Sequence, residues 1–185
     1  MGKLDGKRVA ILVTDGFEQV ELTKPKQALE DAGATTHIVS PKDNEVKGWD
    51  ETNWGDTFSV DISLDQASAD NYDALLLPGG QINPDMLRAD KKAVSFIKSF
   101  GDQHKPIAAI CHGPWTLIEA GLASGRKMTS FNSIQTDLKN AGAHWVDQEV
   151  VVDQGIITSR NPDDIPVFNE TIIEEFAKVD EAAHA

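Results

Sequence analysis

The 185-residue sequence has a single cysteine and only 17 basic side chains against 30 acidic ones. One cysteine cannot form a disulfide within the chain or build a cysteine-based metal cluster. The formal net charge of −13 repels nucleic acid and anionic membrane surfaces, so neither is expected as a partner. No apolar run approaches the roughly 20 residues of a membrane span, and the first residues contain no apolar segment of a secretory signal. We therefore expect a cytoplasmic protein.

Cofactor and metal motifs are lacking as well. No Gly-x-Gly-x-x-Gly follows the first apolar segment and there is no P-loop, so nucleotide cofactors have no support. The five histidines are scattered over separate predicted elements without the spacing of metal ligands. We expect neither a bound cofactor nor a metal.

Apolar segments alternate with amphipathic ones along the chain, which predicts βα units, a largely parallel sheet and one domain over residues 1–185. Strands are predicted over residues 8–13, 35–39, 73–77, 106–110, 127–130, 150–152 and 156–159. Helices are predicted up to Gly33 with Pro25 in the first turn, and over 91–101, 114–123, 133–140 and 165–182. Residues 42–61 break the alternation and indicate a hairpin or irregular excursion.

Cys111 follows a predicted strand and is followed by His112, Gly113 and a helix opened by Pro114. This order predicts a strand-turn-helix elbow that lifts the thiol above the carboxyl edge of the sheet in strained backbone geometry. The helix N-terminus would favour the thiolate by only ~0.3–1 kcal/mol, so a second charge or hydrogen bond is needed. The alternative is a small buried hydrophobe, as free cysteines often are. The elbow context favours a nucleophile.

Several segments together resemble the ThiJ/PfpI family. They are Ala-Ile-Cys-His-Gly-Pro (109–114), Asp-Gly-Phe-Glu-Gln-Val-Glu-Leu (15–22), Leu-Leu-Leu-Pro-Gly-Gly (75–80), Gly-Arg-Lys-Met-Thr-Ser (125–130), Ala-Gly-Ala-His-Trp-Val-Asp (141–147) and Thr-Ser-Arg-Asn-Pro-Asp-Asp (158–164). The resemblance implies a flavodoxin-like, three-layer α/β/α sandwich related to class I glutamine amidotransferases. Family members are described as intracellular cysteine peptidases, protein or nucleotide deglycases, glyoxalases and stress-response proteins. They assemble as dimers, or as hexamers of dimers.

The resemblance also assigns residues. Cys111 matches the family nucleophile and His112 its proton-transfer partner. Glu18 matches a glutamate whose carboxyl contacts the thiol, where one proton should be shared between the two groups; otherwise Glu18 is an ordinary loop or helix-cap carboxylate. Gly79 and Gly80 match the oxyanion-hole position, although a Pro-Gly-Gly turn by itself is usually only a loop.

The sequence departs from the family pattern after Gly80. PfpI-type peptidases place a glutamate there that reaches the histidine across a subunit interface, whereas this chain has one extra residue and Asp85 in that place. Asp85 is either the acid of a triad with His112 or an acid in the first turn of a helix, favoured by the helix dipole. Peptidase-like orientation of His112 depends on which reading holds.

The tryptophans have two readings. Trp49 and Trp54 are packing or interface residues, or they line the pocket; Trp115, one turn past the elbow, borders the pocket or packs beside it.

The first functional hypothesis is a stress-response hydrolase that uses Cys111 on methylglyoxal, glyoxal or early glycation adducts, with proteins or nucleotides as carriers of the adducts. The alternatives are an intracellular cysteine peptidase and a non-enzymatic redox sensor or holdase that works by oxidation of Cys111. The resemblance implies a homodimer or a hexamer of dimers.

Overall fold

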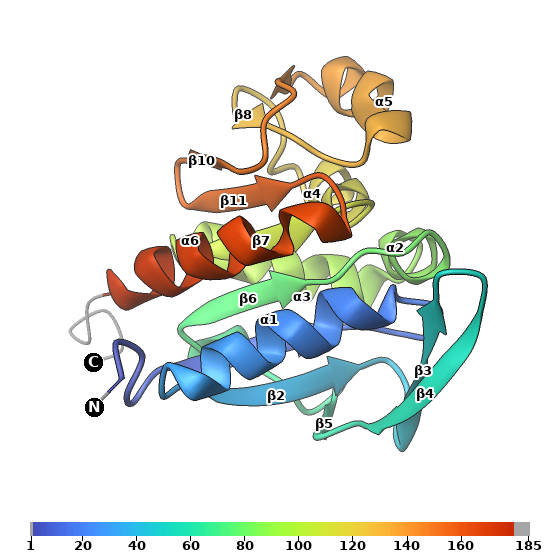
Figure 1. The fold of residues 1–185 in the computed structure, drawn as a ribbon, viewed down its shortest axis with the longest axis vertical. Helices are drawn as coiled ribbons and strands as arrows, with labels where there is room; N and C mark the ends of the chain where they lie inside the picture. Colours follow the sequence, from blue (N-terminus) through green and yellow to red (C-terminus); the bar gives the residue numbers. More distant parts are fainter. Residues whose placement is uncertain (1, 180–185) are drawn as a thin grey trace.

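A computed structural model describes residues 2–179, and its centre is a seven-stranded sheet (Figure 1). All neighbouring strands run parallel except the edge pair β10 and β11. The spatial order is β10 (Val151–Asp153), β11 (Ile156–Ser159), β7 (Ile107–Ile110), β6 (Ala74–Leu77), β1 (Arg8–Leu12), β2 (Thr35–Ser40) and β5 (Ile62–Ser63). The predicted α/β class with a largely parallel sheet is confirmed.

The central strands are buried on both faces, which explains their continuous apolar sequences. Along β1, Val9 and Ile11 join the core under α1 (Gln19–Asp31) and α6 (Ile165–Ala177), whereas Ala10 and Leu12 join the core on the opposite face. That second face is covered by α3 (Lys91–Asp102) and α4 (Pro114–Glu119). The three layers of the predicted sandwich follow from this alternation of side chains.

Two helix predictions are corrected. Pro25 lies inside α1 instead of in its first turn, because the helix already begins at Gln19, directly after Glu18 pairs with Trp49 of the hairpin. The helix after the elbow ends at Glu119, short of residue 123. Gly121, with a φ of 74°, takes the left-handed conformation that ends helices, and its N–H bonds back to the Ile118 carbonyl.

Residues 42–61 form a hairpin of β3 (Glu45–Asp50) and β4 (Asn53–Ser59) at the side of the sheet, as one of the two readings predicted (Figure 1). The hairpin is tied to the loop after β1, since Gly16 N–H donates to the Lys47 carbonyl and Trp49 N–H to the Phe17 carbonyl. It therefore stands at the carboxyl edge of the sheet, where β7 ends.

The remaining elements are short. A short helix, α2 (Ile82–Arg88), follows the Pro-Gly-Gly turn, where one of the two readings of Asp85 had placed a helix. Two-residue strands β8 (Lys127–Met128) and β9 (His144–Trp145) pair in parallel near α5 (Gln135–Asn140). The short 3-10 turns cover Ala69–Asn71, Asn132–Ile134 and Pro162–Asp164. The predicted closing helix, 165–182, ends at Ala177, since residues 178 and 179 are no longer helical, and residues 180–182 lie outside the described part. Within residues 2–179, no helix has the length and apolar character to cross a membrane.

Candidate active site

Cys111 lies at the sharp turn between β7 and α4 with a φ of 64°, a conformation that non-glycine residues rarely adopt. The strain is held by two backbone bonds, Cys111 N–H to the Ser159 carbonyl and Phe131 N–H to the Cys111 carbonyl. At Gly113 a Cβ would come within 2.7 Å of the Leu77 carbonyl oxygen, so the turn requires glycine there. The predicted elbow is confirmed, and backbone strain of this kind concentrates at functional sites.

His112 is in direct contact with the thiol. Its Nδ1 lies 3.2 Å from the Cys111 Sγ and its Nε2 lies 3.3 Å from the Ser133 Oγ. The ring stacks on Phe131, with centroids 4.8 Å apart, and meets the edge of Trp115 at 4.9 Å. Burial lowers the pKa of His112, so the imidazole is neutral near pH 7. We assign its proton to Nε2, which donates to Ser133 and leaves Nδ1 free to accept from the thiol.

Glu21, not Glu18, is the carboxyl beside the thiol. Glu21 is fully buried, its Oε1 accepts the Gly79 N–H at 2.9 Å, and it lies close enough to Cys111 for each group to shift the pKa of the other. Glu18 precedes the helix in extended backbone and accepts the Glu51 N–H at 3.2 Å, so its side chain is directed to the hairpin. The prediction for Glu18 was thus displaced by one helical turn. A signal was present, because Glu21 shares the buried face of the helix with Pro25 and Leu29 at spacings of four.

The electrostatics favour a neutral thiol in the resting site. Burial, followed by the nearby Glu21, raises the pKa of Cys111. Burial also raises the pKa of Glu21 to about 8. The predicted effect of the helix N-terminus is therefore outweighed, since α4 is short and burial costs the charged form more than the helix field returns. Activation of the sulfur requires removal of its proton by a base.

Gly80 and His112 present backbone N–H groups to the sulfur. The Gly79 N–H, which was expected to face an oxyanion, is instead bonded to Glu21. Gly79 has a packing role, since a Cβ there would lie 2.5 Å from the Ile110 oxygen and 2.7 Å from the Cys111 Cβ. The pair of donors beside the sulfur is thus Gly80 and His112.

Asp85 lies in the first turn of α2 and its exposed carboxylate pairs with Arg88 at 2.7 Å. The Arg88 guanidinium in turn stacks 4.1 Å from the centre of the Trp115 ring. Within this chain the position matches the helix-terminal reading of Asp85, and the side chain placed against His112 Nε2 is Ser133. A contact of Asp85 with His112 of another subunit stays a prediction.

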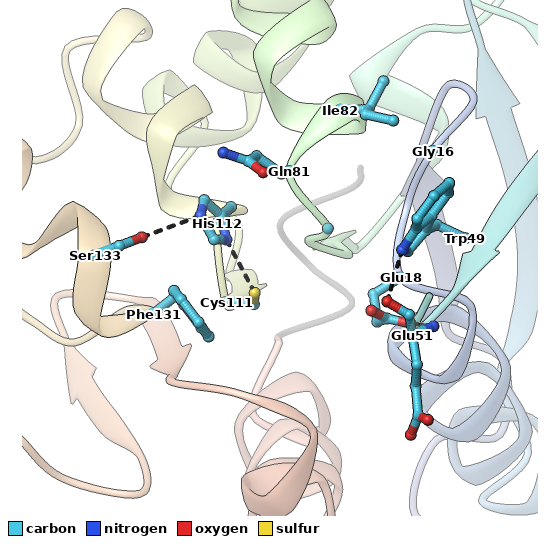
Figure 2. Close-up of a pocket in the computed structure, with 11 residues that line it drawn as sticks. Gly16, Glu18, Trp49, Glu51, Gln81, Ile82, Cys111, His112, Phe131 and Ser133 are labelled. Carbon is cyan, nitrogen blue, oxygen red and sulfur yellow. Dashed lines mark hydrogen bonds between the residues drawn. The ribbon is translucent and has the colours of Figure 1, made fainter. Parts of the chain in front are cut away.

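A cavity of about 430 Å³ opens above the thiol (Figure 2). Its lining contains four of the predicted residues, namely Glu18, Gly80, Cys111 and His112, and also Trp49 from the hairpin. The sequence patterns had not revealed the other lining residues, Gly16, Glu51, Gln81, Ile82, Phe131 and Ser133. Phe131 and Ser133 follow β8, which pairs with β9 outside the seven-stranded sheet, so no strand pattern in the sequence connects them with the elbow.

The fold is that of an α/β protein with a largely parallel sheet. Its candidate nucleophile is a cysteine on a strained strand-helix turn, with a histidine in contact with the sulfur and a buried glutamate close by. The chain belongs to the DJ-1/PfpI family, whose sequence model matches residues 7–175. This confirms the resemblance drawn from the motifs.

Individual relatives support the same family assignment. The chain is 48% identical to "General stress protein 18" of Bacillus subtilis over 166 residues, covering 89% of this chain and 94% of the relative. It is 44% identical to "Putative cysteine protease YraA" of the same organism, covering 88% and 94%. The crystal structure of Drosophila melanogaster DJ-1beta superposes with a TM-score of 0.85 at 29% identity, covering 96% of this chain and 91% of the other.

Proposed function

We propose that this protein is a cysteine-dependent hydrolase that removes methylglyoxal, glyoxal or their early adducts on amino groups and thiols. The observation that carries the proposal is the 3.2 Å contact between the Cys111 thiol and the His112 Nδ1, in a cavity with room for a small carbonyl compound. A neutral imidazole in hydrogen-bond contact with a neutral thiol is the arrangement for general-base activation of a nucleophile.

In the first step the sulfur attacks the aldehyde carbon while His112 Nδ1 takes the thiol proton. The Gly80 and His112 N–H groups face the sulfur in the resting site, and the carbonyl oxygen of a bound aldehyde would meet them as negative charge develops on it. Return of a proton to that oxygen gives a hemithioacetal on Cys111.

With methylglyoxal, transfer of the carbon-bound proton to the neighbouring carbonyl carbon converts the hemithioacetal to a lactoyl thioester. Water then releases lactate and restores the thiol, so one water is consumed and no external oxidant is needed. With a glycated amine or thiol, the same attack displaces the amine or thiol and the net outcome is hydrolysis.

Peptide hydrolysis uses the same groups and is the second candidate, supported by the name of the relative "Putative cysteine protease YraA". It demands a histidine oriented by an acid, whereas the His112 Nε2 faces the Ser133 hydroxyl. A redox sensor needs an accessible thiol of low pKa, whereas Cys111 is 7% exposed and its pKa is raised by burial. We rank aldehyde chemistry above both.

The test measures by NMR the lactate that the purified wild type and the Cys111→Ser variant form from methylglyoxal. A second assay measures casein hydrolysis by the same two proteins. We expect lactate from the wild type, none above background from Cys111→Ser, and little casein cleavage. Equal aldehyde loss with both proteins would refute the enzyme. Casein cleavage that depends on Cys111 without lactate formation would favour the peptidase. A thermal melt of Cys111→Ser checks that the variant is folded.

A further inference from the structure

The cavity above Cys111 has two chemically different walls (Figure 2). On one side stand the thiol, His112 and Phe131. On the other side stand Glu18 and Trp49, which the hairpin and the start of α1 bring to the same place through the Glu18–Trp49 bridge. A substrate whose carbonyl carbon lies at the sulfur must extend its remaining atoms toward this second wall.

The second wall is acidic and has no counter-charge in the cavity. Among residues 2–179, Glu18 and Glu51 line the cavity, and no lysine or arginine does. Of the lining residues that the structure describes, His112 alone carries a titratable nitrogen, and burial lowers its pKa. Below the thiol, the fully buried Glu21 keeps its Oε2 without a hydrogen-bond partner among the described residues. A negatively charged substrate would enter a space that offers the Glu18 carboxylate and a neutral imidazole ring.

Glu18 is held in place as part of this wall. Its carboxylate accepts the N–H of Glu51, a residue with a φ of 54° at the hairpin turn, and the Glu51 carbonyl accepts the Trp49 indole N–H at 2.9 Å. In Figure 2 the Glu51 side chain points away from Cys111, whereas Glu18 lies across the cavity from it. Burial raises the pKa of Glu18, with Asp50 and Glu51 adding to the rise. A cation in the cavity would relieve both the desolvation and the repulsion.

We infer that this site selects substrates that carry a positive charge near the reactive carbonyl, with Glu18 and the Trp49 indole as the cation subsite. Ammonium and guanidinium groups suit a carboxylate, and alkylammonium groups also suit an indole. As far as turnover is concerned, the inference rests on the proposed function. Among the substrates of that function, the site would favour adducts on or beside the basic side chains of proteins over adducts on nucleotides and over anionic carbonyl compounds.

The lone cysteine allows a test that does not depend on turnover. Methanethiosulfonates transfer their alkylthio group to Cys111 as a disulfide and release methanesulfinate, and the added mass reports the rate. Three reagents differ in charge: trimethylammonioethyl, its neutral tert-butylethyl isostere, and sulfonatoethyl. Each rate is divided by the rate of the same reagent with mercaptoethanol, at physiological ionic strength so that distant charges are screened.

We expect the cationic reagent to be fastest and the anionic reagent slowest. Glu18→Gln should lower the ratio of cationic to neutral rates about tenfold, the size of a charge-assisted contact. Glu119→Gln is the matched control, since it removes the same charge from an exposed position on α4, and it should leave the ratio unchanged. Equal ratios in Glu18→Gln and wild type, or an equal fall in both variants, would overturn the subsite.

A turnover experiment separates the subsite from the reaction. Methylglyoxal forms hemithioacetals with thiocholine and with its neutral isostere tert-butylethanethiol, and lactate formation from each is followed. We expect kcat/KM to favour the thiocholine adduct about tenfold in the wild type and to lose that preference in Glu18→Gln. Equal rates from both adducts in the wild type would overturn the inference and leave the proposed function intact. No lactate from either adduct, with the reagent ratios as expected, would refute the proposed function while the cation subsite stands.

Discussion

Replacement of Glu21 by glutamine should change how the stability of the protein depends on pH. The pKa of Glu21 rises from 4.5 to about 8 in the folded chain, chiefly because the carboxyl is fully buried. The folded state therefore holds a proton that the unfolded state releases as the pH rises above 4.5. The contribution of Glu21 to the free energy of unfolding is most favourable below pH 4.5. It falls as the pH rises toward about 8 and levels off above that pH.

The rise corresponds to an upper limit of about 5 kcal/mol in the free energy of unfolding. Glutamine resembles the protonated acid, since its carbonyl can accept the Gly79 N–H in the place of Oε1 and it does not titrate. The difference in free energy of unfolding between Glu21→Gln and wild type should thus grow in favour of the variant by several kcal/mol between about pH 5 and about pH 8.5.

Urea denaturation at several pH values, with the thiol kept reduced, measures this difference. Taking the difference between two proteins cancels the other titrating groups, His112 included. Glu119→Gln, at an exposed position, is the control and should give no such trend. Parallel pH profiles for Glu21→Gln and wild type would show that the buried carboxyl is not held protonated, and the account of the thiol and carboxyl pair would be wrong.

Three further predictions follow from the geometry of the site. His112→Gln should lower kcat for lactate formation about 10²- to 10⁴-fold. Because burial lowers the pKa of His112, wild-type activity should persist below the usual histidine pKa. Loss of activity that already begins above about pH 6.5 on acidification would contradict this. Ser133→Ala removes a 3.3 Å contact to the ring and should lower kcat about tenfold or less; a loss as large as that of His112→Gln would mean that Ser133 has a direct part in the chemistry. Gly80→Ala forces a side chain onto a φ of 77° and within 2.6 Å of the Glu18 nitrogen, so unfolding should become easier by about 3 kcal/mol, and an unchanged melting temperature would argue against the tight turn.

Most strands were predictable because burial on both faces leaves a continuous apolar signature, as at residues 74–77 and 107–110. The ends of the helices were harder to predict from the sequence than the strands. The start of α1 depends on the pairing of Glu18 with Trp49, a contact between residues far apart in the sequence. The helix after the Pro-Gly-Gly turn has only seven residues, too few for a periodic pattern.

The sequence by itself determined the class of fold, the elbow and the identity of the thiol and its histidine, because these depend on neighbours along the chain. Only the tertiary structure decided which glutamate lies under the sulfur, since Glu18 and Glu21 differ by one helical turn and the helix axis selects between them. It also decided that the Gly80 N–H faces the sulfur whereas the Gly79 N–H is bonded to Glu21, and that Ser133 stands where an acid was sought. Finally, burial decided the charge state of Cys111. The sequence predicted that the helix N-terminus, together with a second charge or hydrogen bond, would favour the thiolate. The thiol is instead held neutral, because desolvation exceeds the field of one short helix.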